Sequence, residues 1–357
     1  MSGGGVGGRP ARESGMTQIG IAAFGSYLPE NEVGLDFFRA GGEGPSQGAE
    51  SPMMAPPVAR RHVSPDERAA EMIEKAARPM FDRLGIDPSR ELDIILTNVL
   101  LPDYGITGSG AEAAERLGSA PDWVIDLHNG GCASFAYMLK IASAIIRSEQ
   151  AHSALICNVQ NCAGQLYAQS EVRKRAHAAG PGDGCGVAYV TTDGASAVLG
   201  VKAQHHPELA QVMGLAAPEG RKYWQPGTGQ VDVKFDRDRI VDVVNHGNRV
   251  VPEVVTDLCG QIGISIEEID FLVTNQPNRM FLRNWRQALG VPAERHLDTF
   301  DQFGNLFGAG VPVTLHHAIK AGIVGDGHLV VFAGFAHAGD FAAAAALRWR
   351  SSVHDDR

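Results

Sequence analysis

The stretch DLHNGGCASFAYMLKIASAI, residues 126–145, places one cysteine between a glycine pair and a long apolar run. The segment that starts at Cys132 has the length and the apolar continuity of a buried helix. Gly130 and Gly131 allow the chain to turn sharply from the preceding strand into that helix. The pattern therefore predicts a strand, a tight turn and a buried helix, with Cys132 at the helix N-terminus.

A cysteine in this position has two interpretations. Free N–H groups and the positive end of the helix dipole lower the pKa of a thiol and favour the nucleophilic thiolate. Free cysteines are also among the most buried residues, and most of them are inert. The residues around Cys132 leave both interpretations open. For the other four cysteines an apolar setting favours inert packing: Cys157, Cys162, Cys185 and Cys259.

An internal repeat extends this unit to the whole chain. The first matched pair is LGIDPSRELDIILTN at 84–98 and IGISIEEIDFLVTN at 262–275. The second pair is RLGSAPDWVIDLHNGGCASFAYMLKIASAI at 116–145 and ALGVPAERHLDTFDQFGNLFGAGVPVTLHHAI at 288–319. Two matched blocks in the same order indicate a duplication, with one βαβ-type unit in each half. The alternation of helical and strand patterns predicts the α/β class.

The duplication has a geometric consequence. If the halves pack about a pseudo-twofold axis, Cys132 and Asn305 occupy equivalent strand-to-helix turns. We expect the two turns to meet near that axis. The predicted site then combines Cys132 from the first half with Asn275 and Asn305 from the second.

Composition excludes several classes of function. The 357 residues are 44% hydrophobic and 20% charged, with a net charge of −10 that disfavours general nucleic-acid binding. No run of 18 apolar residues occurs, so no membrane span is expected. The Gly-rich start has no apolar signal-peptide core, and a cytoplasmic location with reduced thiols is expected. The pairs His205–His206 and His316–His317 are interpreted as surface histidines, and no metal site is predicted.

The same patterns divide the chain into segments. We expect a disordered tail at 1–16, a first half at 17–200 and a second half at 236–350. An insertion or linker at 201–235 separates the halves, and a short tail follows at 351–357.

From about residue 17 to residue 350 the chain resembles the β-ketoacyl-ACP synthase III family of the thiolase superfamily. Seven motifs in order carry the resemblance: GSYLPE (25–30), RRHVSPDE (60–67), DLHNGGCASFAYML (126–139), GDGCGVAYV (182–190), VTNQPNRM (273–280), FGNLFGAGVPVTL (303–315) and FAGFAHAGDFAAAAAL (332–347). The resemblance implies a thiolase fold, in which two pseudo-symmetric halves form a layered α-β-α-β-α core. It also implies a homodimer without a permanently bound cofactor.

The resemblance further implies a covalent role for Cys132. In such an enzyme this cysteine accepts an acyl group from a CoA or acyl-carrier-protein thioester. Backbone N–H groups of Cys132 and of the FAHAG loop, residues 335–339, would hold the thioester oxyanion.

The sequence departs from the family at one catalytic position. Where the family has His-Gln-Ala-Asn, this chain has NQPN at 275–278, so Asn275 stands in place of the catalytic histidine. The family's asparagine is retained as Asn305. An amide donates a hydrogen bond to a carbonyl or enolate oxygen, but it cannot act as a base near neutral pH. Ordinary decarboxylative condensation is therefore disfavoured.

Three histidines are candidates for a replacement base. His337 ranks first, because it lies in the loop where the family carries consecutive glycines. His128, four residues before Cys132, ranks second, and His246 ranks third. Asp340 would orient the imidazole of His337 if the loop brings the two together.

Arg279, Arg283 and Arg286 fall on one face of a predicted helix after the NQPN motif. Such a face suits either an acidic carrier protein or the phosphates of CoA. A solvated surface with no ligand is the alternative interpretation.

We therefore expect an acyltransferase of specialised, polyketide-type metabolism. It would pass an acyl group from Cys132 to a small-molecule oxygen, nitrogen or carbon nucleophile. One alternative is carbon–carbon condensation, with Asn275 and Asn305 holding the enolate. A second is a non-catalytic partner subunit of a homologous synthase.

Overall fold

The computed structural model describes residues 18–39, 51–128, 130–210, 212–222, 225, 227 and 229–352. The predicted tail at 1–16 and most of the tail at 351–357 lie outside these residues.

Ten strands form one mixed sheet built from two equivalent sets. The first set contains β1 (Ile19–Tyr27), β4 (Ile94–Val99), β5 (Trp123–Asp126), β6 (Ser153–Gln160) and β7 (Gly184–Thr192). The second contains β8 (Ser196–His205), β11 (Phe271–Thr274), β12 (His296–Leu297), β13 (Leu329–Ala336) and β14 (Phe341–Arg348).

Both sets have the same topology. The strand orders are β5-β4-β6-β7-β1 and β12-β11-β13-β14-β8. In each set the first three strands are parallel, and the remaining two join antiparallel. The sets meet where β1 pairs with β8 through Gly20–Ala197 and Ile21–Ser196. The predicted pair of pseudo-symmetric halves is confirmed.

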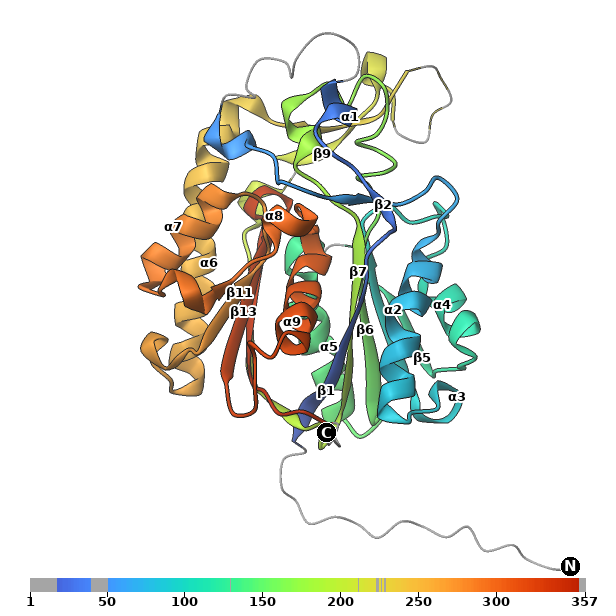
Figure 1. Ribbon diagram of the computed structural model, residues 1–357, viewed down its shortest axis with the longest axis vertical. Coiled ribbons are helices and arrows are strands. Elements are labelled where there is room, and N and C mark those ends of the chain that lie inside the picture. Colours follow the sequence, from blue (N-terminus) through green and yellow to red (C-terminus); the bar gives the residue numbers. More distant parts are fainter. Residues whose placement is uncertain are drawn as a thin grey trace, which may run out of the picture.

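Helices cover the outer faces of both sets and fill the space between them (Figure 1). The six main helices are α2 (Ala69–Leu84), α4 (Gly110–Leu117), α5 (Ser134–Arg147), α6 (Ile240–Ile262), α7 (Arg279–Leu289) and α9 (Gly310–Lys320). The central α5 and α9 contact strands of both sets. Helices α2 and α4 pack on the first set. Helix α6 packs on the second set, and α7 packs against α6. These are the five layers that the resemblance implied.

Smaller elements complete the chain. They are β2 (Asn31–Glu32), α1 (Asp36–Arg39), β3 (Arg61–His62), α3 (Pro88–Glu91), β9 (Met213–Ala216), β10 (Asp232–Phe235) and α8 (Phe300–Phe303). Strands β2 and β3 pair with each other, as do β9 and β10. Within the described ranges no helix is both long enough and apolar enough to cross a bilayer.

Each central helix is entered through a tight glycine-containing turn. A 3₁₀ turn at Gly131–Ala133 leads into α5, and its equivalent at Phe307–Ala309 leads into α9. Gly131 has a φ of +46°, and a Cβ there would lie 2.7 Å from the Ala336 Cβ. The predicted sharp turn is therefore present. Cys132 occupies this turn, and the α-helix itself begins two residues later.

The loop after β6 is fixed to the first half by a buried carboxylate. Asp183 accepts backbone N–H bonds from Val63 at 2.9 Å, and from Ala163 and Gly164 at 2.7 Å each. Burial raises the pKa of Asp183 to about 7, although these N–H groups oppose the shift. The carboxylate therefore fixes the start of a loop that later contributes Tyr167 to the site.

Central-helix packing predicts a large, position-specific loss of stability. Leu139 of α5 is fully buried between the two sets of strands, whereas its neighbour Lys140 is exposed. Leu139→Ala leaves a cavity and should lower the free energy of unfolding by about 2–5 kcal/mol. Lys140→Ala should change it by less than about 0.5 kcal/mol. Urea denaturation of both variants measures the difference, and equal effects would contradict this account of the core.

Candidate active site

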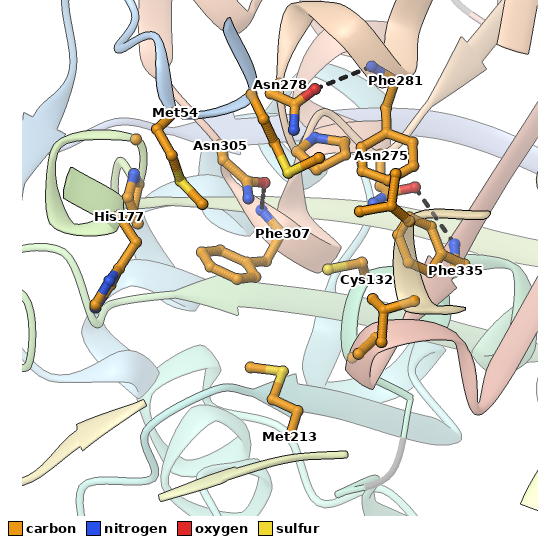
Figure 2. A pocket seen from close by; sticks show the side chains of 18 of the residues that line it. Met54, Cys132, His177, Met213, Asn275, Asn278, Phe281, Asn305, Phe307 and Phe335 are labelled. Carbon is orange, nitrogen blue, oxygen red and sulfur yellow. Dashed lines mark hydrogen bonds between the residues drawn. The ribbon is translucent and has the colours of Figure 1, made fainter. Parts of the chain in front are cut away.

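The turn that carries Cys132 opens onto a cavity of about 270 Å³ between the two halves. Most of its wall is apolar, including Met54, Phe281, Phe307 and Phe335. Figure 2 shows Cys132 between the side chains of Phe307 and Phe335. Apolar walls with a few polar groups are typical of small-molecule sites. The cavity therefore suits an acyl chain attached at the sulfur.

Burial dominates the acidity of Cys132. Desolvation raises the pKa of its thiol to about 12, although hydrogen bonds from the Asn275 side chain and from its own backbone N–H lower it. The expectation that the helix N-terminus would lower this pKa is wrong, because desolvation outweighs the favourable N–H groups. At neutral pH the thiol of the empty site is protonated and needs a proton acceptor in order to react.

The side chain of Asn275 is fixed against the nucleophile. This residue follows β11 and is almost completely buried. Its Oδ1 accepts a hydrogen bond from the Phe335 backbone N–H at 3.3 Å, and its side chain also hydrogen-bonds the Cys132 sulfur. With Oδ1 occupied, Nδ2 is the donor that is available to the sulfur. The structure thus brings together two of the predicted site residues.

Asn305 has a similar arrangement on the opposite wall. Its Oδ1 accepts from the Phe307 backbone N–H at 3.0 Å. Its backbone N–H donates to the Gly180 carbonyl at 2.9 Å, which ties this turn to the first half. The residue lines the cavity, and the remaining side-chain donor is again Nδ2. Two amide donors therefore belong to one cavity.

His337 lies at the predicted place and has the predicted partner. Its Nδ1 is 3.1 Å from Asp340 Oδ1, and a carboxylate only accepts, so Nδ1 carries the hydrogen. On the other side of the ring, Nε2 lies 2.9 Å from where a Gly131 Cβ would stand. Both His337 and Cys132 line the cavity. The imidazole thus adjoins the nucleophile turn and keeps Nε2 as an acceptor.

The turn that holds His337 is strained. His337, Ala338 and Gly339 follow β13 with φ values of +46°, +69° and +117°. Non-glycine residues in this region cost about 1–3 kcal/mol each and tend to occur at functional sites. Glycine would adopt this path without the cost, so the turn is strained at His337 and Ala338.

His246 stabilises this turn and is not placed as a base. Its Nε2 donates to the Gly339 carbonyl at 3.0 Å, and Arg249 donates to its Nδ1 at 3.2 Å. Burial and the neighbouring charges of His206 and Arg249 lower the pKa of His246 despite the bond to Gly339. Because both ring nitrogens are engaged, neither is left for a substrate proton. His128 is exposed and is not part of the cavity lining.

The three arginines do not act as one surface. Arg279 pairs with Asp301, donates to the Ala55 and Pro56 carbonyls and lies over the Phe300 ring. It therefore fastens the segment that carries Met53–Ala55, which lines the cavity. Arg283 is exposed and Arg286 is half-buried. These two side chains are the remainder of the predicted basic face.

Sequence reasoning missed a second polar group in the same cavity. His177 lines the wall, with Nε2 3.2 Å from Asp232 Oδ1. Arg175 Nη1 lies 2.6 Å from the other oxygen of Asp232. No motif signals this arrangement, since Asp232 lies in the predicted insertion, 55 residues after His177. In the described residues no group of three or more His, Cys, Asp or Glu side chains has the arrangement of a metal site.

Comparison with known proteins identifies the class first. The solved synthase III structure from Thermus thermophilus superposes with a TM-score of 0.79 at 24% identity, over 93% of this chain and 99% of that one. The FabH structure from Pseudomonas aeruginosa gives 0.77 at 21%, over 94% and 100%. The fold is thus a thiolase-like α/β fold, here with a cysteine at the turn into its first central helix.

Sequence comparison then shows which family the chain is similar to. The model of 3-oxoacyl-ACP synthase III matches residues 125–207, and that of its C-terminal part matches residues 259–349. The β-ketoacyl-ACP synthase III of Clostridium perfringens is 24% identical over 328 residues, covering 90% of this chain and 96% of its own. The chain is a distant homologue of the β-ketoacyl-ACP synthase III transferases.

The raised pKa of Cys132 predicts how fast the thiol is alkylated. With a pKa of about 12, only about one thiol in ten thousand is ionised at pH 8. Since the thiolate is the nucleophile, the iodoacetamide rate at Cys132 should rise about tenfold per pH unit from 7 to 10. Asn275→Ala removes a hydrogen-bond donor that stabilises the thiolate, so alkylation of Cys132 in this variant should be slower at each pH. Peptide mass mapping follows the reaction, and a plateau below pH 9 would contradict the high pKa.

Proposed function

We propose that this protein is an acyltransferase of specialised, polyketide-type metabolism. Cys132 takes an acyl group from an acyl-CoA or acyl-ACP thioester and passes it to a hydroxyl or amine. The observation that carries this proposal is the His337–Asp340 pair beside the nucleophile turn. Asn275 leaves the family's base position without a base, and His337 supplies one from the end of the neighbouring parallel strand of the same half.

The first step forms the acyl-enzyme. Nε2 of His337 takes the Cys132 proton as sulfur attacks the thioester carbonyl, and the imidazolium then gives this proton to the departing thiolate. Asp340 accepts from Nδ1 and stabilises the transient positive charge. Proton removal at the moment of attack is consistent with a thiol that is protonated in the empty site.

The second step reverses these roles. The acceptor O–H or N–H gives its proton to His337 Nε2 as its oxygen or nitrogen attacks the acyl carbonyl. The Cys132–acyl bond breaks, and the imidazolium returns the proton to the sulfur. The Cys132 backbone N–H faces its own sulfur and is one candidate donor to the oxyanion.

Carbon–carbon bond formation is the second candidate. The amide oxygens of Asn275 and Asn305 both accept backbone N–H bonds, which leaves two Nδ2 donors associated with the cavity. Two such donors would stabilise the enolate of a decarboxylating partner. This reaction needs no base at Asn275, so it competes with transfer to oxygen or nitrogen.

We also propose a cytoplasmic homodimer formed through β5. This strand is an edge of the ten-stranded sheet, and its Val124 is 41% exposed. Tyr104 and Ile106 on the loop before α4 are exposed as well. Edge strands with exposed apolar side chains are suited to pairing with a second copy.

CoA or carrier protein is the proposed donor, with Arg283 and Arg286 available to its phosphates or acidic groups.

Single-turnover acylation tests the nucleophile and the base separately. Wild type should gain an acyl mass from one of a panel of acyl-CoA and acyl-ACP donors, and Cys132→Ala should gain none. His337→Ala should slow transfer to an alcohol or amine by about 10²–10⁴-fold. Asp340→Asn should slow it less, because the base remains but loses its orienting charge. Intact-protein mass spectrometry measures each species.

The outcomes separate the alternatives. Transfer to alcohols that is unchanged in His337→Ala would overturn the assignment of the base. Carbon–carbon products from a malonyl thioester, lost in Asn275→Ala and Asn305→Ala, would favour condensation. A wild type that accepts no acyl group would overturn the acyltransferase and favour the non-catalytic partner subunit.

His246 should affect transfer through the turn and not through its own proton. His246→Ala loses the bond to Gly339 and should slow transfer about tenfold, whereas Gln can keep a donor near the Nε2 position and should have a smaller effect. In both variants the pH profile should keep its midpoint. Rates measured from pH 5 to 9 check this, and a displaced midpoint would show that His246 itself exchanges the proton.

A further inference from the structure

The wall of the cavity that carries His177 contains a second polar cluster. Figure 2 places His177 and Met213 well away from Asn275 and Phe335, with Cys132 nearer to the latter pair. Its polar groups come from the loop after β6 and from the β9–β10 hairpin. They are separate from the His337–Asp340 pair, and the acyl-transfer steps do not use them.

His177 is held in place by three neighbouring side chains. Asp232, 6% exposed, accepts from His177 and pairs with Arg175. The ring of Tyr167 lies edge-on to His177, with centroids 5.9 Å apart. These contacts fix the orientation of the imidazole.

The hairpin that supplies Asp232 is fastened to the same loop. Gln169 donates to the Val231 carbonyl at 2.8 Å, and Gln230 donates to the Ser170 hydroxyl at 2.8 Å. The Glu171 N–H donates back to the Gln230 side chain at 2.8 Å. The wall is therefore built from two segments that meet along several bonds, and His177 does not depend on a single contact for its position.

The hydrogen bonds determine which ligand atoms His177 can bind. Because the Asp232 carboxylate only accepts, His177 Nε2 carries the hydrogen, and Nδ1 of the neutral ring is an acceptor. No described residue donates to Nδ1. Arg175 balances the charge of Asp232, so the cluster is neutral when the ring is neutral. A neutral acceptor site favours an uncharged donor such as a hydroxyl over a carboxylate or a phosphate.

Tyr167 links the two parts of the cavity. It lines the wall beside His177, and Cys132 lines the same cavity. A ligand attached at the sulfur shares this cavity with the imidazole of His177. One molecule can therefore occupy both parts at once.

We infer that His177 binds the acyl acceptor, and that this acceptor is an uncharged compound with at least two hydroxyl groups. One hydroxyl reacts at acyl-Cys132, and another donates to His177 Nδ1. This inference rests on the proposed acyl transfer and adds the substrate class. His177 is a specificity residue here, and the proton transfer remains with His337.

A series of matched alcohols tests the inference. The acyl-Cys132 protein is mixed with 1,4-butanediol, 1,6-hexanediol or 1,8-octanediol, each compared with the mono-alcohol of equal chain length. Discharge is followed by intact-protein mass spectrometry. For at least one length the diol should discharge wild type about three- to tenfold faster per hydroxyl than its mono-alcohol, the range expected of one hydrogen bond.

Three variants assign that preference to His177. His177→Ala should lower the rate per hydroxyl of each preferred diol to that of the mono-alcohol of equal length. His177→Asn can place an amide oxygen near the Nδ1 position and should retain part of the preference. Asp232→Asn removes the carboxylate that fixes the tautomer and should reduce it. Thermal melting shows whether each variant is folded.

The failure of this inference differs from the failure of the proposed function. Equal discharge by diols and mono-alcohols at every length, or a preference that survives in folded His177→Ala, would overturn the role of His177 and leave acyl transfer standing. The absence of any acyl-Cys132, or an acyl-Cys132 that no alcohol discharges, would overturn the proposed function and this inference together.

Discussion

The close approach of the two halves at the nucleophile is the constraint on which the site depends. A Cβ on Gly334 of β13 would lie 2.7 Å from the Cys132 carbonyl oxygen and 3.2 Å from Asn275 Oδ1. A Cβ on Gly308 would lie 2.7 Å from the Gly131 carbonyl oxygen. Backbone therefore packs directly on backbone here. Because no side chain separates the turns, residues from both halves reach one sulfur atom.

This packing also explains the electrostatics of the site. Excluding water from the turn raises the pKa of the thiol, and the same exclusion strengthens every hydrogen bond that the sulfur receives. A buried neutral thiol is protected from premature reaction and becomes reactive when a base is within reach. His337 fits this requirement, but the position forces it into a left-handed turn. The His246 bond to Gly339 and the His206 N–H bond to the Asp340 carbonyl hold that turn from outside.

The sequence predicts the framework better than the details of the site. The two repeats predicted equivalent halves because repeated βαβ patterns preserve apolar periodicity and turn residues, and these dictate strand order. The same matches placed Cys132 and Asn305 at equivalent turns and assigned Asn275 to the same predicted site. The sign of the Cys132 pKa shift was not predictable, because it depends on how much water the other half excludes. The hydrogen-bond partners of Arg279 were not predictable either, because Ala55 and Pro56 lie more than 200 residues away in the chain.

The chemistry and the selectivity of this site have different origins in the sequence. Cys132, Asn275 and His337 follow strands of the duplicated sheet, so their positions are set by the rigid core. His177 and Asp232 come from a loop and an insertion that have no counterpart in the repeat. Such segments can change without disturbing the sheet, because their contacts are largely with each other. A core that holds an acyl group and a replaceable wall that binds its acceptor would allow one fold to serve many acceptors, and in this chain His177 is the wall residue that we propose for the acceptor.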